Sequence, residues 1–213
     1  MQKKSAKPQP HGAPRLAPRQ VRIIGGAWKR TLLPVLDANG LRPTPDRVRE
    51  TVFNWINHQL GGDWDRACFL DLFAGSGALG FEAASRGAAK VIMVDNYAPA
   101  AHQLDANREK LKANQVTVLR ADALALVRDL AARGQRFDVI FLDPPYQLDL
   151  LEQILPLCPA ILNEGGMVYA EAGAPLVLEG DAVPDWLAGW EAVRADKAGM
   201  VYYYLLRLHE NNT

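Results

Sequence analysis

A short acidic motif, Asp143-Pro144-Pro145-Tyr146, directly follows an apolar run that is typical of a buried strand. A carboxylate accepts a hydrogen bond from an NH2 group, and a proline carbonyl accepts a second because proline has no competing N–H. The tyrosine ring adds a stacking face. We therefore predict that these four residues form a catalytic site that holds an exocyclic amine, of a nucleobase or a side-chain amide, next to an electrophile.

A glycine-rich turn follows an earlier apolar run. Gly75, Gly77 and Gly80 match the G-x-G-x-x-G pattern of nucleotide-binding turns, and Asp95 follows at the spacing of a ribose-binding acid. Asp71 decides between cofactors, because a carboxylate opposes a bound pyrophosphate by about 4 kcal/mol per unit-charge pair at 4 Å. The same carboxylate attracts the ammonium of S-adenosylmethionine. Together with the acidic motif, the turn predicts N-methylation with S-adenosylmethionine as the methyl donor.

Other polar residues follow the next predicted strands. Asp95 is able to accept from both ribose hydroxyls, and Asp122 is in position to meet the adenine amine. Asp122 also suits the N-cap of the helix after it, and the glycines also suit close helix packing without a ligand. The residues that we expect to bind the cofactor are Asp71, Phe73, Gly75, Gly77, Gly80, Asp95, Asn96, Asp122 and Ala123.

The elements that must hold these residues alternate along the chain. Helical patterns separate predicted strands near residues 68–73, 90–95, 115–120, 137–142 and 166–171. This alternation is typical of an α/β fold with a mainly parallel sheet that helices cover on both faces. Residues 190–195 and 201–208 predict a terminal hairpin, so the last strand is expected to be antiparallel.

The N-terminal part reads differently. Residues 21–33 predict two short strands about a Gly25-Gly26 turn. Thr44 suits the N-cap of a following helix and Pro45 its first position. We expect residues 1–20 to form a basic, proline-rich and disordered tail, residues 21–60 to form an RNA-docking appendage, and residues 61–213 to form the catalytic domain.

Composition and charge limit the classes of function. The 213 residues are 49% hydrophobic and 23% charged, which is normal for one globular domain. The two cysteines form no disulfide framework or metal-ligand cluster, and no apolar run is long enough to span a membrane. We therefore expect a cytoplasmic protein without a metal, and a monomer suffices for the predicted activity.

Positive charge gathers at the N-terminal end. Residues 1–36 hold eight Lys or Arg and no acid, which leaves a charge of −8 on the rest because the formal net charge is zero. Such a concentration favours a polyanionic partner. We expect a basic rim beside the catalytic cleft, although Arg49 and Glu50 also suit a structural pair, and Arg42 and Thr44 also suit the start of a helix. The residues expected to contact RNA are Arg22, Trp28, Lys29, Arg30, Arg42, Thr44, Arg47 and Arg49.

The chain resembles the bacterial small-subunit ribosomal RNA guanine-N2 methyltransferases of the RsmD family. The likeness covers most of residues 20–208. It depends on the segments 22–28, 41–55 and 71–80 and on the acidic motif at 143–146. The Arg-Pro-Thr-x-Asp-Arg-Val-Arg-Glu string that begins at Arg42 is the most specific of these, because the other two motifs occur in many methyltransferases.

The resemblance implies a class I methyltransferase fold with seven strands and S-adenosylmethionine as the donor. It also implies a specific guanine of 16S rRNA, guanine 966, as the acceptor. The implied substrate is a partly or fully assembled small ribosomal subunit, so contacts with neighbouring ribosomal proteins are expected.

Three other functions remain open from the sequence. A DNA adenine-N6 methyltransferase shares the logic of the acidic motif, but no separate target-recognition domain is evident. An NAD-dependent oxidoreductase fits the glycines, yet it must tolerate Asp71 beside a pyrophosphate. A noncatalytic RNA-binding scaffold explains the basic end and leaves Asp143 unexplained.

Overall fold

The computed structural model describes residues 20–35, 44–145, 149–177 and 182–209. Tyr146, Arg42 and the basic tail before Gln20 lie outside these ranges, so the predictions made for them stay predictions. The helices are α1 (Asp46–Gln59), α2 (Ala78–Ser85), α3 (Ala98–Leu111), α4 (Ala123–Ala132) and α5 (Leu150–Ile154), with short 3-10 turns η1 (Trp64–Arg66), η3 (Leu155–Ile161) and η4 (Asp185–Leu187). The strands are β1 (Gln20–Arg22), β2 (Leu32–Pro34), β3 (Cys68–Asp71), β4 (Lys90–Asp95), β5 (Val116–Arg120), β6 (Phe137–Leu142), β7 (Leu162–Ala172), β8 (Trp190–Ala198) and β9 (Val201–Leu208).

Within the described residues, seven strands form one sheet in the order β5-β4-β3-β6-β7-β9-β8. Strands β3 to β7 pair in parallel, while β9 runs antiparallel to both β7 and β8. The predicted α/β fold, with its mainly parallel sheet and terminal hairpin, is confirmed. The strand order reverses beside β3, which is where ligands bind in open sheets of this kind.

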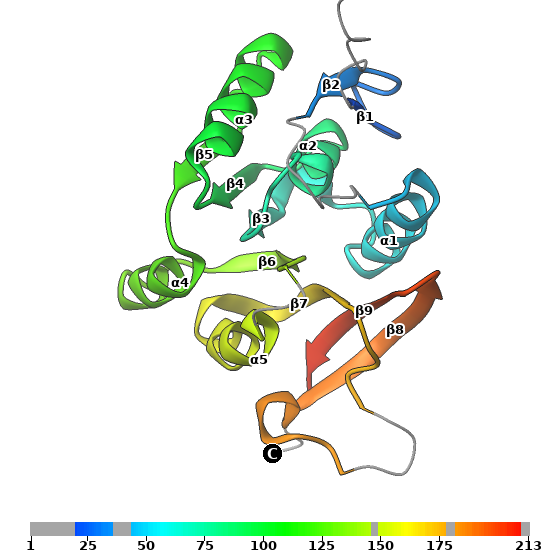
Figure 1. The fold of residues 1–213 in the computed structure, drawn as a ribbon, viewed down its shortest axis with the longest axis vertical. Helices are drawn as coiled ribbons and strands as arrows, with labels where there is room; N and C mark the ends of the chain where they lie inside the picture. Colours follow the sequence, from blue (N-terminus) through cyan, green and yellow to red (C-terminus); the bar gives the residue numbers. More distant parts are fainter. Residues whose placement is uncertain (1–19, 36–43, 146–148, 178–181, 210–213) are drawn as a thin grey trace, which may run out of the picture.

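Helices lie on both sides of the sheet (Figure 1), and an apolar layer packs them against each face. One layer joins α1, α2 and α3 to one face, and the other joins α4, α5 and η3 to the opposite face. Val52, Phe53 and Ile56 of α1 are fully buried in the first layer. Thus α1 shares the core of the catalytic domain, although its sequence suggested part of an appendage.

The N-terminal hairpin is wider than its sequence predicts. Strands β1 and β2 pair antiparallel, but nine residues separate Arg22 from Leu32, so Gly25-Gly26 is not a two-residue hairpin turn. Instead, Gly26 packs against the end of α2. Its φ is +72°, and an added Cβ would lie 1.8 Å from the carbonyl oxygen of Ser85. Glycine is required here by both conformation and space.

The buried carboxylate of Glu82 on α2 fixes this N-terminal segment. Glu82 is fully buried, and its carboxylate accepts the backbone N–H groups of Ile24 at 2.7 Å and Gly25 at 2.8 Å. The Arg86 side chain also donates to Glu82 at 2.9 Å. The segment is therefore anchored on the helix that follows the glycine turn.

The start of α1 differs from its prediction. Pro45 is the N-cap and no side chain caps the helix, so the assignment of Thr44 as the N-cap is wrong. The Thr44 hydroxyl instead donates to Glu171 at 2.9 Å. That contact ties the entry to α1 to the end of β7. Among the described residues, no helix has the length and apolar character that crossing a membrane requires.

Candidate active site

Asp71 ends β3 and lies under the glycine turn that leads into α2. Its side chain is 1% exposed, and its Oδ2 accepts the backbone N–H of Gly80 at 3.1 Å. Burial raises the pKa of Asp71 to about 7, and the negative charge of Asp95 raises it further, while N–H donors from Gly80 and Phe73 act in the opposite direction. A carboxyl group in such surroundings suits a ligand cation, which would stabilise its charged form.

The glycine turn is packed on one side and open on the other. Gly77 has a φ of +78°, and a Cβ there would lie 2.6 Å from Phe81 and 2.7 Å from Leu104. Among the described residues, a Cβ at Gly75 would, in contrast, meet only the carbonyl oxygen of Phe73 within 4 Å, at 3.9 Å. The space beside Gly75 can therefore admit a ligand. This arrangement fits the predicted cofactor.

Asp95 ends β4, which lies next to β3. Its Oδ2 accepts the N–H of Gly75 at 2.9 Å, and its Oδ1 accepts the N–H of Tyr97 at 2.8 Å. A carboxylate has about four lone-pair positions, so it can still accept from ribose hydroxyls. Tyr97 is 53% exposed and was missed from the sequence, although an aromatic residue so close to this acid is a usable signal for a stacking face.

Asp122 is the N-cap of α4, as the sequence allowed. Its Oδ1 accepts the N–H of Ala125 at 2.9 Å. Ala123 is buried in the first turn of α4, and Phe73 packs partly buried against the same apolar layer. The proposed contacts of Phe73, Asn96, Asp122 and Ala123 with the cofactor stay predictions.

Three acids meet at the carboxyl edge of neighbouring strands, and we call Asp71, Asp143 and Glu171 the carboxylate row. Strand β6 lies between β3 and β7, with Phe141 paired to Asp71 and Leu142 paired to Ala170. Asp143 is two residues beyond Phe141 and lies beside Glu171. Because residues in register share a face and alternate along a strand, all three acids belong to the face that α1 and α2 cover.

The electrostatics of the row follow from this crowding. Burial raises the pKa of Asp143 well above its ordinary value, and the negative charges of Glu171 and Asp71 raise it further. Like charges at close range disfavour simultaneous ionisation. A ligand that brings N–H donors or a cation into the row would relieve that repulsion.

Glu171 was missed from the sequence. Its side chain is 3% exposed, and its Oε1 accepts the hydroxyls of Thr44 at 2.9 Å and Tyr169 at 2.7 Å. A signal was available, because an acid that ends the apolar run 167–170 is unusual in a buried strand. Without the register of β6 against β7, however, nothing connected this acid to Asp143.

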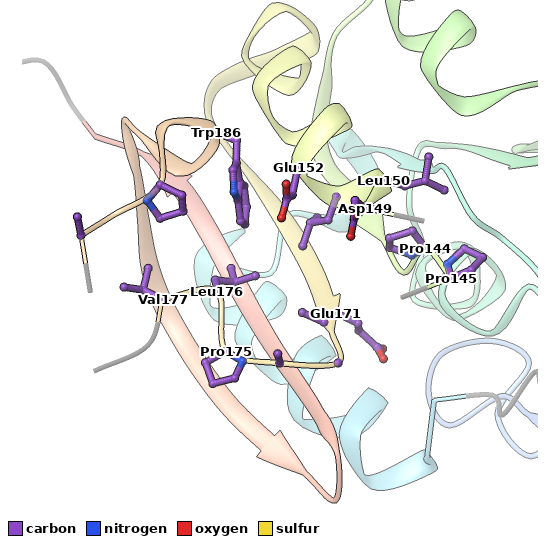
Figure 2. A pocket seen from close by; sticks show the side chains of 16 residues that line it. Pro144, Pro145, Asp149, Leu150, Glu152, Glu171, Pro175, Leu176, Val177 and Trp186 are labelled. Atoms are coloured by element: carbon purple, nitrogen blue, oxygen red, sulfur yellow. The ribbon is translucent and has the colours of Figure 1, made fainter. Parts of the chain in front are cut away.

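A cavity of about 440 Å³ opens beside the acidic motif. Pro144 and Pro145 form one wall, and the chain after β7 forms the other, with Leu176 and Trp186 (Figure 2). The lining residues among those that the structure describes include acids and no Lys or Arg. The cavity therefore suits an uncharged planar group with N–H donors and disfavours a phosphate.

A family model described as "Conserved hypothetical protein 95" matches residues 21–207. The protein named Ribosomal RNA small subunit methyltransferase D from Escherichia coli K12 is 39% identical over 188 residues, which cover 87% of this chain and 89% of the relative. The Haemophilus influenzae protein of the same name is 38% identical over 198 residues, which cover 90% and 94%. The chain belongs to the RsmD family.

The fold of this RsmD-family chain is also found in a solved structure. The candidate methyltransferase yhhF of Escherichia coli superposes with a TM-score of 0.74 at 37% identity, over 89% of this chain and 98% of the other. The resemblance seen in the sequence is therefore confirmed at the level of the family and of the methyltransferase fold.

The basic residues of this RsmD-family chain divide into two groups. Lys29, Arg30 and Arg47 are exposed, and Trp28 is partly buried. Arg22 is also exposed, but its guanidinium pairs with Asp46. The exposed cations remain candidates for RNA contact.

Arg49 and Thr44 are the buried members of the predicted RNA-contacting set. Arg49 is 1% exposed, pairs with Asp46 at 2.6 Å, donates to the Arg22 carbonyl at 2.9 Å and lies 3.9 Å from Glu82. Thr44 is 8% exposed. Neither side chain is available at the surface, so the structure favours the structural roles that the sequence also allowed for them. The spacing of Arg49 four residues before Phe53 was the missed signal, because it puts the two on one helix face.

Proposed function

We propose that this chain transfers a methyl group from S-adenosylmethionine to the exocyclic N2 of a guanine in 16S rRNA, on an assembled or assembling small subunit. One observation carries the proposal. Asp143 and Pro144 follow β6 directly beside Asp71 and the glycine turn, which is where an amine and a sulfonium methyl group would have to meet. The names of the related proteins from Escherichia coli and Haemophilus influenzae support ribosomal RNA as the substrate class. The protein would act as a monomer in the cytoplasm.

The residues around the turn fit the cofactor. Bound S-adenosylmethionine supplies an electrophilic methyl group on a positively charged sulfur. Asp71 would accept from the ammonium, and Asp95 would accept from the ribose hydroxyls with the lone pairs that Gly75 and Tyr97 leave available. A dinucleotide is disfavoured, because its pyrophosphate would approach the carboxylate of Asp71.

The acidic motif would position the acceptor. Asp143 and the Pro144 carbonyl would accept hydrogen bonds from the two N–H groups of N2, so that the nitrogen lone pair faces the methyl group. The N–C bond forms as the C–S bond breaks, and the electron pair of that bond stays on sulfur. Asp143 would then take the proton that the cationic nitrogen releases, and its raised pKa makes it a stronger base than an ordinary aspartate.

Access to this site requires a base outside any helix stack. A guanine in a duplex does not present its N2 to a buried carboxylate, so the target would be flipped or single-stranded. Tyr146 would stack on the extruded base, which is worth about 1–3 kcal/mol. The exposed cations Lys29, Arg30 and Arg47 would hold the RNA backbone near the N-terminal segment.

The test is methyl transfer to a defined acceptor. Purified protein would be incubated with labelled S-adenosylmethionine and small subunits from cells that lack this gene, and the modified nucleotide would be mapped by mass spectrometry. Label on one guanine N2 of 16S rRNA is the expected result. Transfer to DNA adenine and not to subunits would contradict the substrate, and no transfer to any nucleic acid would contradict the activity.

A further inference from the structure

Glu171 is a buried acid at the carboxyl end of β7, beside the acidic motif. It lies one residue before the end of β7 and is 3% exposed, and its negative charge raises the pKa of the neighbouring Asp143. A carboxyl group in an apolar core costs free energy unless donors satisfy it. Donors hold Glu171, and its place in the lining of the cavity beside Asp143 suits it to ligand recognition.

The surroundings of Glu171 hold its carboxylate in one orientation. The hydroxyls of Thr44 and Tyr169 both donate to Oε1, at 2.9 Å and 2.7 Å. Tyr169 is fully buried and Thr44 is 8% exposed, so both donors are fixed by packing. Figure 2 shows Glu171 at the end of the cavity near Pro144 and Pro145, away from Trp186.

Glu171 and Asp143 stand side by side. The preceding residues Ala170 and Leu142 are paired in register, and neighbouring strands lie about 4.8 Å apart. A base whose amine is held by Asp143 therefore presents the adjoining atom of its Watson–Crick edge toward Glu171. In guanine that atom is N1, which carries a proton beside the N2 amine. In adenine the ring nitrogen beside the amine carries a lone pair, which a carboxylate repels.

We propose that Glu171 is the residue that selects guanine, by accepting the N1–H while Asp143 holds the N2 amine. The proposal rests on the methyl transfer to a guanine proposed above and adds the determinant of base choice. Guanine offers three N–H hydrogens along one edge, which match two adjacent carboxyl groups and reduce their mutual repulsion. Thr44 and Tyr169 act as positioning residues for the Glu171 carboxylate.

The test compares two acceptors that share the reacting amine. Small subunits would be reconstituted from 16S rRNA that carries either guanine or 2-aminopurine at the methylated position. 2-Aminopurine keeps the N2 amine but has an unprotonated N1. The measured quantity is the ratio of kcat/KM for guanine to that for 2-aminopurine, in the wild type, in Glu171→Gln and in the control Glu164→Gln, an exposed acid on the same strand.

The expected result is a change in the ratio. Glu171→Gln should lower kcat/KM for guanine by about 10- to 100-fold, because a hydrogen bond to a charged group is lost, and should leave 2-aminopurine unchanged or improved. Glu164→Gln should change neither value. The difference in intrinsic reactivity between guanine and 2-aminopurine cancels, because the wild type and each variant are compared on the same two acceptors.

Other outcomes overturn the proposal. If Glu171 only supports the fold, Glu171→Gln lowers both values by the same factor and the ratio is unchanged. If the variant does not fold, Tyr169→Phe removes one donor to the carboxylate and must still reduce the ratio several-fold. If the wild type methylates guanine subunits and neither variant changes the ratio, base selection by Glu171 is wrong while the proposed activity stands. If the wild type methylates nothing, the proposed function fails and the inference fails with it.

Discussion

Asp71 is deeply buried and lies beside the glycine turn. Burial of its charged form lowers the stability of the folded protein, whereas its position suits it to bind the cofactor. Its pKa of about 7 in the folded protein exceeds the ordinary 3.8. The unfolded chain therefore loses this proton at lower pH than the folded chain does. Stability contributed by the protonated group is present below pH 4 and is lost as the pH rises toward 7.

Asp71→Asn should therefore make the protein more stable at pH 8 and weaken cofactor binding. The pKa shift corresponds to about 4 kcal/mol at 1.36 kcal/mol per unit, which is an upper bound on the gain. The gain should vanish near pH 4. Urea unfolding at both pH values measures the first effect, and calorimetric titration with S-adenosylmethionine measures the second. Asp129→Asn, at an exposed ion pair on α4, is the control and should show no such gain. Stability lost at pH 8, or unchanged cofactor affinity, would contradict this account of Asp71.

Asp143 should control the acid limb of the pH–activity profile. It must be ionised to accept from the amine, and burial with Glu171 and Asp71 nearby raises its pKa. The kcat/KM for methyl transfer should therefore fall on acidification at a pH above the ordinary aspartate range. In Glu171→Gln one negative charge is removed, so the limb should shift to lower pH. An unchanged limb would mean that another group titrates.

Asp143→Ala should lower turnover by at least about 100-fold, because the positioned acceptor and base is lost. Binding of S-adenosylmethionine should be retained, since the residues proposed to bind it, Asp71 and Asp95, are left intact. Single-turnover transfer and cofactor titration separate the two effects. Near-normal turnover with the cofactor bound would show that the carboxylate does not take part.

Among individual residues, the sequence located those whose chemistry is local. Asp71 and Asp95 each end a strand and Asp143 directly follows one, so an apolar run followed by an acid was enough to find them. Arg49 and Glu171 were misread or missed because their roles depend on partners distant in sequence. Arg49 lies 3.9 Å from Glu82, and Glu171 lies beside Asp143.

At the scale of elements, the strands of the parallel sheet were predictable and their registers were not. The predicted run near 137–142 matches β6, but β7 begins at Leu162, earlier than the predicted 166. The pairing of β6 with β7 shifts register between Phe137 and Val139. Such an irregularity leaves no clear trace in the alternation of apolar residues, so the neighbour of Asp143 required the structure.

The N-terminal segment shows the same dependence on distant partners. Its Gly25-Gly26 pair reads as a hairpin turn, yet the structure uses it to seat residues 23–30 on α2. The N–H of Ala27 donates to the Ser85 carbonyl at 2.7 Å, and the N–H of Trp28 donates to the Ser85 hydroxyl at 2.9 Å. This seat fixes the exposed cations of the segment relative to the glycine turn.

Gly26→Ala should disrupt the packing of residues 23–30 against α2. A Cβ would lie 1.8 Å from the Ser85 carbonyl oxygen, so the segment must move and Glu82 must lose backbone donors. Gly134→Ala is the matched control, because Gly134 has a similar φ of +66° and no atom of the described residues lies within 4 Å of the added carbon. Both changes carry the strain of a left-handed residue, about 1–2 kcal/mol. Gly26→Ala should cost at least about 2 kcal/mol more in urea unfolding. Equal losses of unfolding free energy in the two variants would show that the packing of residues 23–30 against α2 contributes nothing to stability.

For the molecule as a whole, positive charge gathers in the N-terminal part and negative charge at the candidate active site, and the two suit different parts of an RNA strand. Residues 1–36 carry a charge of +8 and the rest of the chain carries −8. The carboxylate row and the acids that line the cavity repel phosphate, while the exposed cations near α2 and α1 attract it. An RNA strand would therefore keep its backbone on the N-terminal side and extend only a base into the acidic site. Such an arrangement favours an extruded nucleotide over a duplex.

This division makes the salt dependence of RNA binding specific to position. Each true phosphate contact contributes roughly 0.7–0.9 to the slope of log K against log salt concentration. Lys29→Gln and Arg47→Gln should each reduce the slope by about that amount. Arg128→Gln, at an exposed position on α4 across the sheet, should leave it unchanged. The measurement is binding of small subunits at several salt concentrations. If Arg128→Gln reduced the slope as much as Lys29→Gln, the attraction would come from net charge alone, and the proposed orientation of the RNA would fail.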